Sequence, residues 1–199
     1  MLLSRAYLGM QCFWGESAFA KLKGVKKTRV GYAGGTTVNP SYVNIGDHTE
    51  VIEVQFDSSV VSYEDILEFF WSHHNPAQQR KKQYQSAILY ETDEEKEIAE
   101  KSYKRAKFCL FEIDSLIDFQ KNYHQKYWLR NETDIFNELK LSDSEVASSV
   151  LAAKMNAYCA GYNDFSELEE LKKEYGLSNS LVNRVKKFAI AGGNSRACH

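Results

Sequence analysis

The chain has 199 residues, of which 43% are hydrophobic, so it is long enough to bury a substantial core. Its formal net charge is only -2 at pH 7, which provides no field strong enough to attract nucleic acid or an anionic membrane surface. No segment has the pattern of a signal peptide or a membrane span, and the four cysteines contain no Cys-x-x-Cys pair. We therefore expect a non-secreted, cytoplasmic protein with reduced thiols and no zinc ribbon.

The first half of the chain alternates between strand and helix patterns. The expected elements are, in order, a strand over 5–8, a helix over 15–22 that ends at Gly24, strands over 25–32 and 50–56, a helix that Ser62 and Asp65 cap, and a strand over 86–90. This β-α-β-β-α-β order is that of ferredoxin-like domains. We therefore predict an α/β fold of the α+β kind, a two-layer sandwich in which two helices cover one face of a mainly antiparallel sheet.

The second half has mainly helical signals. A charge-rich helix is expected from Thr92 to about residue 107, followed by an edge strand over 108–113. Capping patterns that begin at Ser142 and Asp164, with a stop at Gly176, predict a helical C-terminal extension. We expect residues 1–130 to form a catalytic core, and residues 131–199 to form this extension and to end in a flexible, cysteine-bearing tail.

Cys12 is the strongest candidate for chemistry. It falls between the first strand and the first helix, where unpaired backbone N–H groups and the positive helix end stabilise a thiolate. Such a position can lower a cysteine pKa from ~8.5 to about 3.5–7.5, although Cys12 could instead be a small buried hydrophobe. Phe13 and Trp14 follow directly, and they either line a socket for a methyl or thioether group or fill the core.

Other polar side chains could contribute to the same site. Glu50 has the same strand parity as Ile52 and Val54, so we expect its carboxyl group to lie on the apolar face, where burial raises its pKa. Alternatively, Glu50 lies at the end of the strand, where it is solvated or ion-paired. Loop tyrosines could converge on a polar ligand atom; they are Tyr42, Tyr84 and Tyr127. The histidine spacing gives no support for a metal site, so we expect none. Cys198 follows a Gly-Gly tail and either reaches a distant sulfur or is an incidental exposed thiol.

These residues fall in ordered motifs that resemble the A-type peptide methionine sulfoxide reductases, in the animal-like form with a C-terminal helical extension. The matching segments are Met10-Gln11-Cys12-Phe13-Trp14-Gly15, Gly31-Tyr32-Ala33-Gly34-Gly35, Asn39-Pro40-Ser41-Tyr42, Asp47-His48-Thr49-Glu50-Val51, Phe70-Trp71-x-x-His74-Asn75-Pro76, Gln83-Tyr84-Gln85-Ser86-Ala87-Ile88, Tyr123-His124-Gln125-Lys126-Tyr127 and Asn156-Ala157-Tyr158-Cys159-Ala160-Gly161. The sequence departs from the family pattern at three places, namely Gln11, Asn122 and the Arg80–Lys82 loop.

The resemblance implies reduction of methionine S-sulfoxide, free and in proteins, and hence repair of oxidised proteins. It implies that Cys12 attacks the sulfoxide sulfur, that Glu50 protonates the oxygen, that Tyr42 and Tyr127 hydrogen-bond that oxygen, that Phe13 and Trp14 hold the methyl group, and that His48 and Tyr84 contribute to substrate binding. It also implies a catalytic cycle without a bound cofactor.

The same resemblance implies how Cys12 is regenerated. Cys12 becomes a sulfenic acid, which a second cysteine converts to an intramolecular disulfide that thioredoxin, or dithiothreitol in vitro, reduces. Cys159 matches the family's recycling cysteine and Cys198 lies in a tail like the family's mobile end, so either could attack first. Cys109 is expected to be a bystander. We expect a monomer whose partners are thioredoxin and oxidised proteins or peptides.

Two other functions are compatible with parts of the sequence. A thiol peroxidase could use the same nucleophile but has no need of aromatic residues for a methyl group beside it. An RNA-recognition domain shares the β-α-β-β-α-β order, but Val30 and Gly34 replace its basic and aromatic residues and no basic stripe extends beyond Arg80–Lys82. The motifs favour the reductase.

Overall fold

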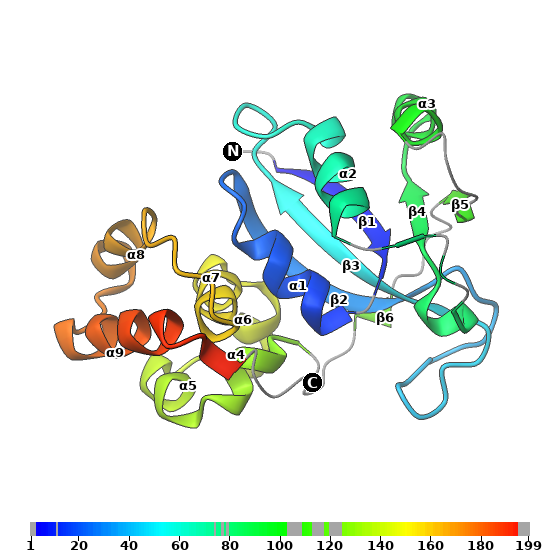
Figure 1. Cartoon of the computed structure of the whole chain (residues 1–199). Coiled ribbons are helices and arrows are strands. Elements are labelled where there is room, and N and C mark those ends of the chain that lie inside the picture. The colour runs from blue at the N-terminus through cyan, green and yellow to red at the C-terminus, as the bar shows by residue number, and fades with distance from the viewer. Residues whose placement is uncertain are drawn as a thin grey trace.

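The computed structural model describes residues 3–10, 12–73, 75–76, 78, 80–102, 109–112, 118–119 and 125–194, with the backbone alone for Cys12, 109–112 and 118–119. Its elements are β1 (Ser4–Gly9), α1 (Cys12–Ala20), β2 (Val25–Ala33), β3 (Thr49–Phe56), α2 (Tyr63–Ser72), η1 (Lys82–Tyr84), β4 (Ala87–Tyr90), α3 (Asp93–Ser102), β5 (Cys109–Glu112), β6 (Asp118–Phe119), α4 (Tyr127–Asn131), α5 (Thr133–Leu139), α6 (Asp143–Ser148), α7 (Val150–Cys159), α8 (Leu168–Tyr175) and α9 (Asn179–Ile190). In Figure 1, α1 and α2 lie over one face of the sheet, and the helices from α4 onward gather beside α1.

The described strands form one sheet in the order β5-β4-β1-β3-β2-β6. The four central strands pair antiparallel, with Leu8 of β1 opposite Ile52 of β3 and Ile88 of β4. The predicted ferredoxin-like core is therefore confirmed. The expected edge strand is β5, which runs parallel to β4, whereas β6 was not predicted because a two-residue strand has no periodicity to detect.

The main core lies between the sheet and the two helices that cover it. Ile52, Val54 and Phe56 share one face of β3, as their alternation predicted, and pack with Phe19 of α1 and Phe70 of α2. All five side chains are buried. The apolar face of the sheet therefore fixes where α1, and with it Cys12 at its start, lies on the sheet.

A second core joins the C-terminal helices to α1. Trp128 of α4 is its largest buried side chain, and α7 contributes buried residues along its length. Ala20 meets Ala153 and Ala157, and these small side chains let α1 and α7 approach closely. Phe13 packs against both cores, so the residue after Cys12 links the sheet to the C-terminal helices.

Helix boundaries agree with the predicted ones where the capping residues lie next to the helix end in the sequence. Ser62 and Ser142 both form the predicted capping boxes, and Gly176 ends α8 with φ of 64°. The prediction at Asp164 was wrong: its carboxylate accepts from the Ser166 N–H at 3.0 Å within a turn, and α8 begins only at Leu168.

Two other helices have bounds that differ from the predicted ranges. The first helix begins at Cys12 rather than at Gly15. Gly15 lies inside the helix, where an added Cβ would overlap Ile52 and Met10, so it serves close packing there. The predicted helix from Thr92 is present as α3, whose described part ends at Ser102; the expected continuation over 103–107 lies outside the described residues. No helix in the described part of the chain is both long and apolar enough to cross a membrane.

Candidate active site

Cys12 is the first residue of α1. The backbone N–H groups of a first helical turn have no intrahelical partners and carry the positive end of the helix dipole, which favours an anion. The described first turn of α1 contains no acidic residue that would oppose a thiolate there. The side chain of Cys12 lies outside the described residues, so its nucleophilic role stays a prediction.

The two aromatic residues that follow Cys12 pack against α4. The ring centroid of Phe13 lies 5.0 Å from that of Tyr127 and 5.9 Å from that of Trp128, and Trp14 meets Trp128 edge-on at 5.5 Å. The structure thus brings together Phe13, Trp14 and Tyr127, three residues that the sequence nominated. Trp128 is 1% exposed and was not nominated, although it directly follows Tyr127 in the matching motif.

Glu50 is buried near the start of β3. The residue is 2% exposed, which excludes the solvated strand end that the sequence left open. The Gln83 Nε2 donates to Glu50 Oε1 at 2.7 Å. Two further hydrogen bonds tie this segment to β3, because Gln85 Nε2 donates to Thr49 Oγ1 at 2.8 Å and Thr49 Oγ1 donates to the Lys82 carbonyl at 3.1 Å. Gln83 was not predicted as a site residue from the sequence either, because only its contact with Glu50 in the structure places it at the site.

A pocket of about 280 Å³ connects this segment to α1. Its described lining is Met10, Trp14, Ala18, His73, Arg80, Tyr84 and Tyr162. Tyr84 belongs to the same 3-10 turn as Gln83, so the pocket adjoins the residue that holds Glu50. Arg80, from the loop that departs from the family pattern, contributes a cationic wall, and its Nε is buried without a partner in the described structure.

Tyr42 and His48 lie in the loop between β2 and β3, and neither is among the described residues that line this pocket. Tyr42 is 43% exposed. His48 is buried, with its Nε2 at 2.7 Å from the Thr37 carbonyl oxygen. Hydrogen bonds from the Thr36 backbone and hydroxyl hold the pKa of Asp47 well below its usual range. The roles of Tyr42 and His48 in substrate binding stay predictions.

A fully buried ion pair holds Tyr127 against α1. Lys126 Nζ donates to Glu16 Oε1 at 2.6 Å and to the Thr28 carbonyl at 2.7 Å, and the Lys126 backbone N–H donates to Glu16 Oε2 at 2.8 Å. Burial lowers the pKa of Lys126, and the Glu16 carboxylate opposes that change. Lys126 adopts φ of 58°, a left-handed conformation that starts α4 at Tyr127. Because Glu16 lies one helical turn after Cys12, the pair sets Tyr127 relative to the predicted nucleophile.

The two proposed resolving cysteines differ in what the structure describes. Cys159 is the last residue of α7 and is fully buried in the second core. Burial raises the pKa of its thiol, and the Glu132 carboxylate raises it further. Gly193 packs against the Cys159 carbonyl so closely that a Cβ there would overlap it. Cys198 lies outside the described residues, as does the side chain of Cys109.

Comparison with known proteins identifies the family to which this site belongs. Residues 4–158 match the family model described as peptide methionine sulfoxide reductase. The chain belongs to the peptide methionine sulfoxide reductase family. It is therefore an enzyme of the oxidoreductase class, and the identification made from its motifs is confirmed.

Individual members of the peptide methionine sulfoxide reductase family resemble the chain over most of its length. The enzyme of Drosophila melanogaster is 38% identical over 184 residues, which covers 87% of this chain and 75% of that protein. The MsrA of Methanococcus maripaludis is 36% identical over 151 residues, or 66% of this chain and 96% of that protein. The structure of methionine sulfoxide reductase A of Corynebacterium diphtheriae superposes with a TM-score of 0.56 at 27% identity, covering 65% of this chain and 76% of that one.

Proposed function

We propose that the chain reduces the S epimer of methionine sulfoxide, free and in proteins, to methionine, with Cys12 as the nucleophile. The observation that carries the proposal is the arrangement around the start of α1. Phe13 and Trp14 pack with the α4 aromatics there, and Trp14 and Tyr84 line a pocket that adjoins the residue binding the buried Glu50. An apolar surface beside a nucleophile and a buried acid suits a methyl sulfoxide, whose one polar atom is its oxygen.

In the proposed reaction, the Cys12 thiolate attacks the sulfoxide sulfur while Glu50 gives a proton to the sulfoxide oxygen. Burial supports this role for Glu50, because a carboxyl group removed from water is favoured in its neutral, proton-donating form. Tyr42 and Tyr127 are proposed to hydrogen-bond the same oxygen, with His48 and Tyr84 as further substrate contacts. The oxygen ends on Cys12 as a sulfenic acid, and the sulfur leaves as the thioether of methionine.

A second thiol must then regenerate Cys12. We propose that Cys198 attacks the sulfenic sulfur first, which forms a disulfide and releases the oxygen as water. The burial of Cys159 supports this order, because an inaccessible thiol with a raised pKa supplies little thiolate. Cys159 would then take part only when the end of α7 opens, and Cys109 not at all. Thioredoxin is the proposed physiological reductant of the disulfide.

The remaining features of the proposal come from the sequence. We propose that the chain acts as a monomer in the cytoplasm and that its physiological role is the repair of oxidised proteins. We propose further that it needs no bound cofactor or metal. Its catalytic core is proposed to span residues 1–130, with a helical extension after it. The packing of α7 on α1 means that the two proposed parts share buried contacts.

The test is reduction of the separated S and R epimers of a blocked methionine sulfoxide, with dithiothreitol as reductant. The native protein is expected to reduce the S epimer alone, and Cys12→Ser to reduce neither. Turnover that survives in Cys12→Ser would contradict the mechanism. Faster turnover of hydrogen peroxide than of either sulfoxide would favour the peroxidase instead.

A further inference from the structure

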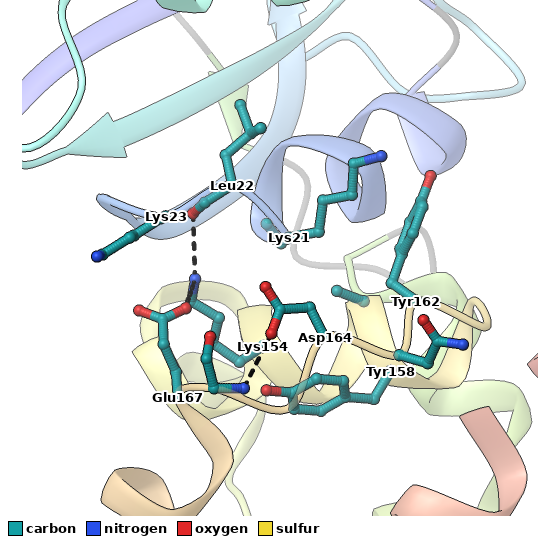
Figure 2. Close-up of a pocket in the computed structure, with 12 residues that line it drawn as sticks. Lys21, Leu22, Lys23, Lys154, Tyr158, Tyr162, Asp164 and Glu167 are labelled. Atoms are coloured by element: carbon teal, nitrogen blue, oxygen red, sulfur yellow. Dashed lines mark hydrogen bonds and ion pairs between the residues drawn. The ribbon is translucent and has the colours of Figure 1, made fainter. Parts of the chain in front are cut away.

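A second pocket, of about 420 Å³, lies at the other end of α1 from Cys12. It is formed by the end of α1 and the turn after it, by one side of α7, and by the loop that leads to α8 (Figure 2). Its described lining is Ala20, Lys21, Leu22, Lys23, Lys154, Ala157, Tyr158, Tyr162, Asn163, Asp164, Ser166 and Glu167. Nothing in the proposed reaction uses this pocket.

Buried polar contacts build the pocket. Lys154 is only 3% exposed, and its Nζ lies 2.5 Å from Glu167 Oε2 while donating to the Leu22 carbonyl at 3.3 Å (Figure 2). Tyr158 is also buried, at 4% exposed. These contacts tie α7, the loop before α8 and the end of α1 to one another. The shape of the pocket is therefore fixed before any ligand arrives.

The second pocket adjoins the first, because Tyr162 lines both. The Lys21 ammonium lies 4.6 Å from the Tyr162 ring centroid and 5.4 Å from that of Phe69, which stacks on His73 of the first pocket. Trp14 in α1 and Leu22 in the turn after α1 are separated by roughly 12 Å at the rise per residue of a helix. An extended peptide covers that distance with about four residues. The two pockets thus form one surface along α1, which we call the α1 groove, defined by the two linings given above.

The α1 groove carries an excess of positive charge. Arg80 lines it at the first pocket, and Lys21 and Lys23 line it at the second. Neither Lys21 nor Lys23 has a carboxylate within 4.0 Å in the part of the chain that the structure describes. The ion pair of Lys154 and Glu167 is neutral as a unit, which leaves Asp164 as the opposing charge in the described lining. Three cations against one carboxylate favour an anionic ligand, even though the whole chain has a net charge of -2.

We propose that the α1 groove binds the substrate polypeptide on one side of its oxidised methionine and favours acidic side chains about four residues from it. This inference rests on the proposed function, because it places the methionine sulfoxide itself in the first pocket. The preferred substrates are then oxidised proteins with acidic residues near the exposed methionine. The free amino acid does not reach Lys21 or Lys23 and gains nothing from them.

The test compares peptides that contain one methionine S-sulfoxide and carry either glutamate or glutamine about four residues away on both sides. The native protein is expected to show a kcat/KM about fivefold higher for the glutamate peptide, the size that exposed ion pairs allow, and the preference should shrink as salt is added. The double charge reversal Lys21→Glu with Lys23→Glu is expected to abolish or invert the preference. Lys187→Glu, at an exposed position of α9, is expected to leave it unchanged.

Reduction of a blocked methionine S-sulfoxide distinguishes failure of the groove from failure of the proposed function. If the double variant reduces it as fast as the native protein does, the variant is folded and its lost preference belongs to the groove. If the native protein does not reduce it, the proposed function fails. Titration of both peptides into Cys12→Ser tests the groove without turnover, by the ratio of Kd values. Equal kcat/KM and equal Kd for the two peptides would overturn the proposal.

Discussion

Cys12 and Cys159 lie at opposite ends of their helices. Cys12 is the first residue of α1, where the helix dipole favours a thiolate, and Cys159 is the last residue of α7, where the dipole disfavours one. Cys159 is also fully buried, and burial raises the pKa of its thiol. Position and solvation therefore act in the same direction on Cys159 and keep it as a protonated core residue.

Cys159 is accordingly expected to resist alkylation in the folded protein. At pH 8, iodoacetamide should leave Cys159 unmodified in the native state and modify it fully in urea, as followed by mass spectrometry of its peptide. Because a raised pKa keeps the thiol protonated at this pH, a modest increase in pH should not change the result. Cys159→Ala should keep its turnover with thioredoxin. Loss of that turnover in a folded variant would restore Cys159 as a resolving residue.

Glu50 is expected to act as the proton donor. Glu50→Gln removes the acid while its amide oxygen can still accept from Gln83, so we expect kcat to fall by about 10²–10⁴ without loss of the fold. The matched control is Glu68→Gln, on an exposed position of α2. Steady-state kinetics and a thermal melt of both variants check this. A Glu50→Gln enzyme with native kcat would remove Glu50 from the mechanism.

Among the elements, the turn before α4 depends on one buried charge pair. Removing one member should be costly because the other charge remains buried without its counter-charge, so Lys126→Met is expected to destabilise the fold by about 3–5 kcal/mol. The double variant Glu16→Leu with Lys126→Met should recover much of that loss. Urea unfolding of the single and double variants measures the coupling free energy. Additive effects in this cycle would show that the pair does not act as a unit.

Sequence predicted the elements whose signals are local. The capping boxes at Ser62 and Ser142 lie within four residues of chain, and the alternation of β3 placed Glu50 on its buried face. The helix start predicted at Asp164 was wrong, because an aspartate side chain accepts hydrogen bonds from backbone N–H groups in turns as readily as at helix starts.

Contacts between residues far apart in the sequence could not be predicted from local capping and alternation patterns. The Lys126–Glu16 bond joins residues 110 positions apart, and a lysine is ordinarily assigned to the surface. Gln83 likewise gains its part in the site only from a contact with β3, 33 positions away. The site residues were therefore predicted from the order of the motifs, because periodicity alone does not identify them.

At the scale of the whole molecule, the C-terminal helices pack against the side of α1. Ala20, Ala153 and Ala157 form the place where α1 and α7 meet, and Phe13 packs into both cores. The family model ends at residue 158, so α8 and α9 lie beyond the matched range. They complete the second core around α7 through residues such as Leu171 and Val185.

This packing predicts that a larger side chain between α1 and α7 affects both stability and catalysis. Ala153→Leu adds volume at a fully buried position, and we expect it to cost about 1–3 kcal/mol and to lower kcat/KM by displacing α1. Ala191→Leu adds the same volume at an exposed position after α9 and should change neither quantity. Chemical denaturation and kinetics of the two variants test this. Native activity in a destabilised Ala153→Leu would show that α7 supports the fold alone.

The most direct test of the account is a single turnover without reductant. The reduced protein is mixed with an excess of blocked methionine S-sulfoxide, the methionine formed is counted, and the cysteine pairing is read by peptide mapping under acid quench. We expect one disulfide per chain, between Cys12 and Cys198, with Cys159 and Cys109 as free thiols. Methionine formed while Cys12 remains a free thiol, or a Cys12–Cys109 bridge, would contradict it.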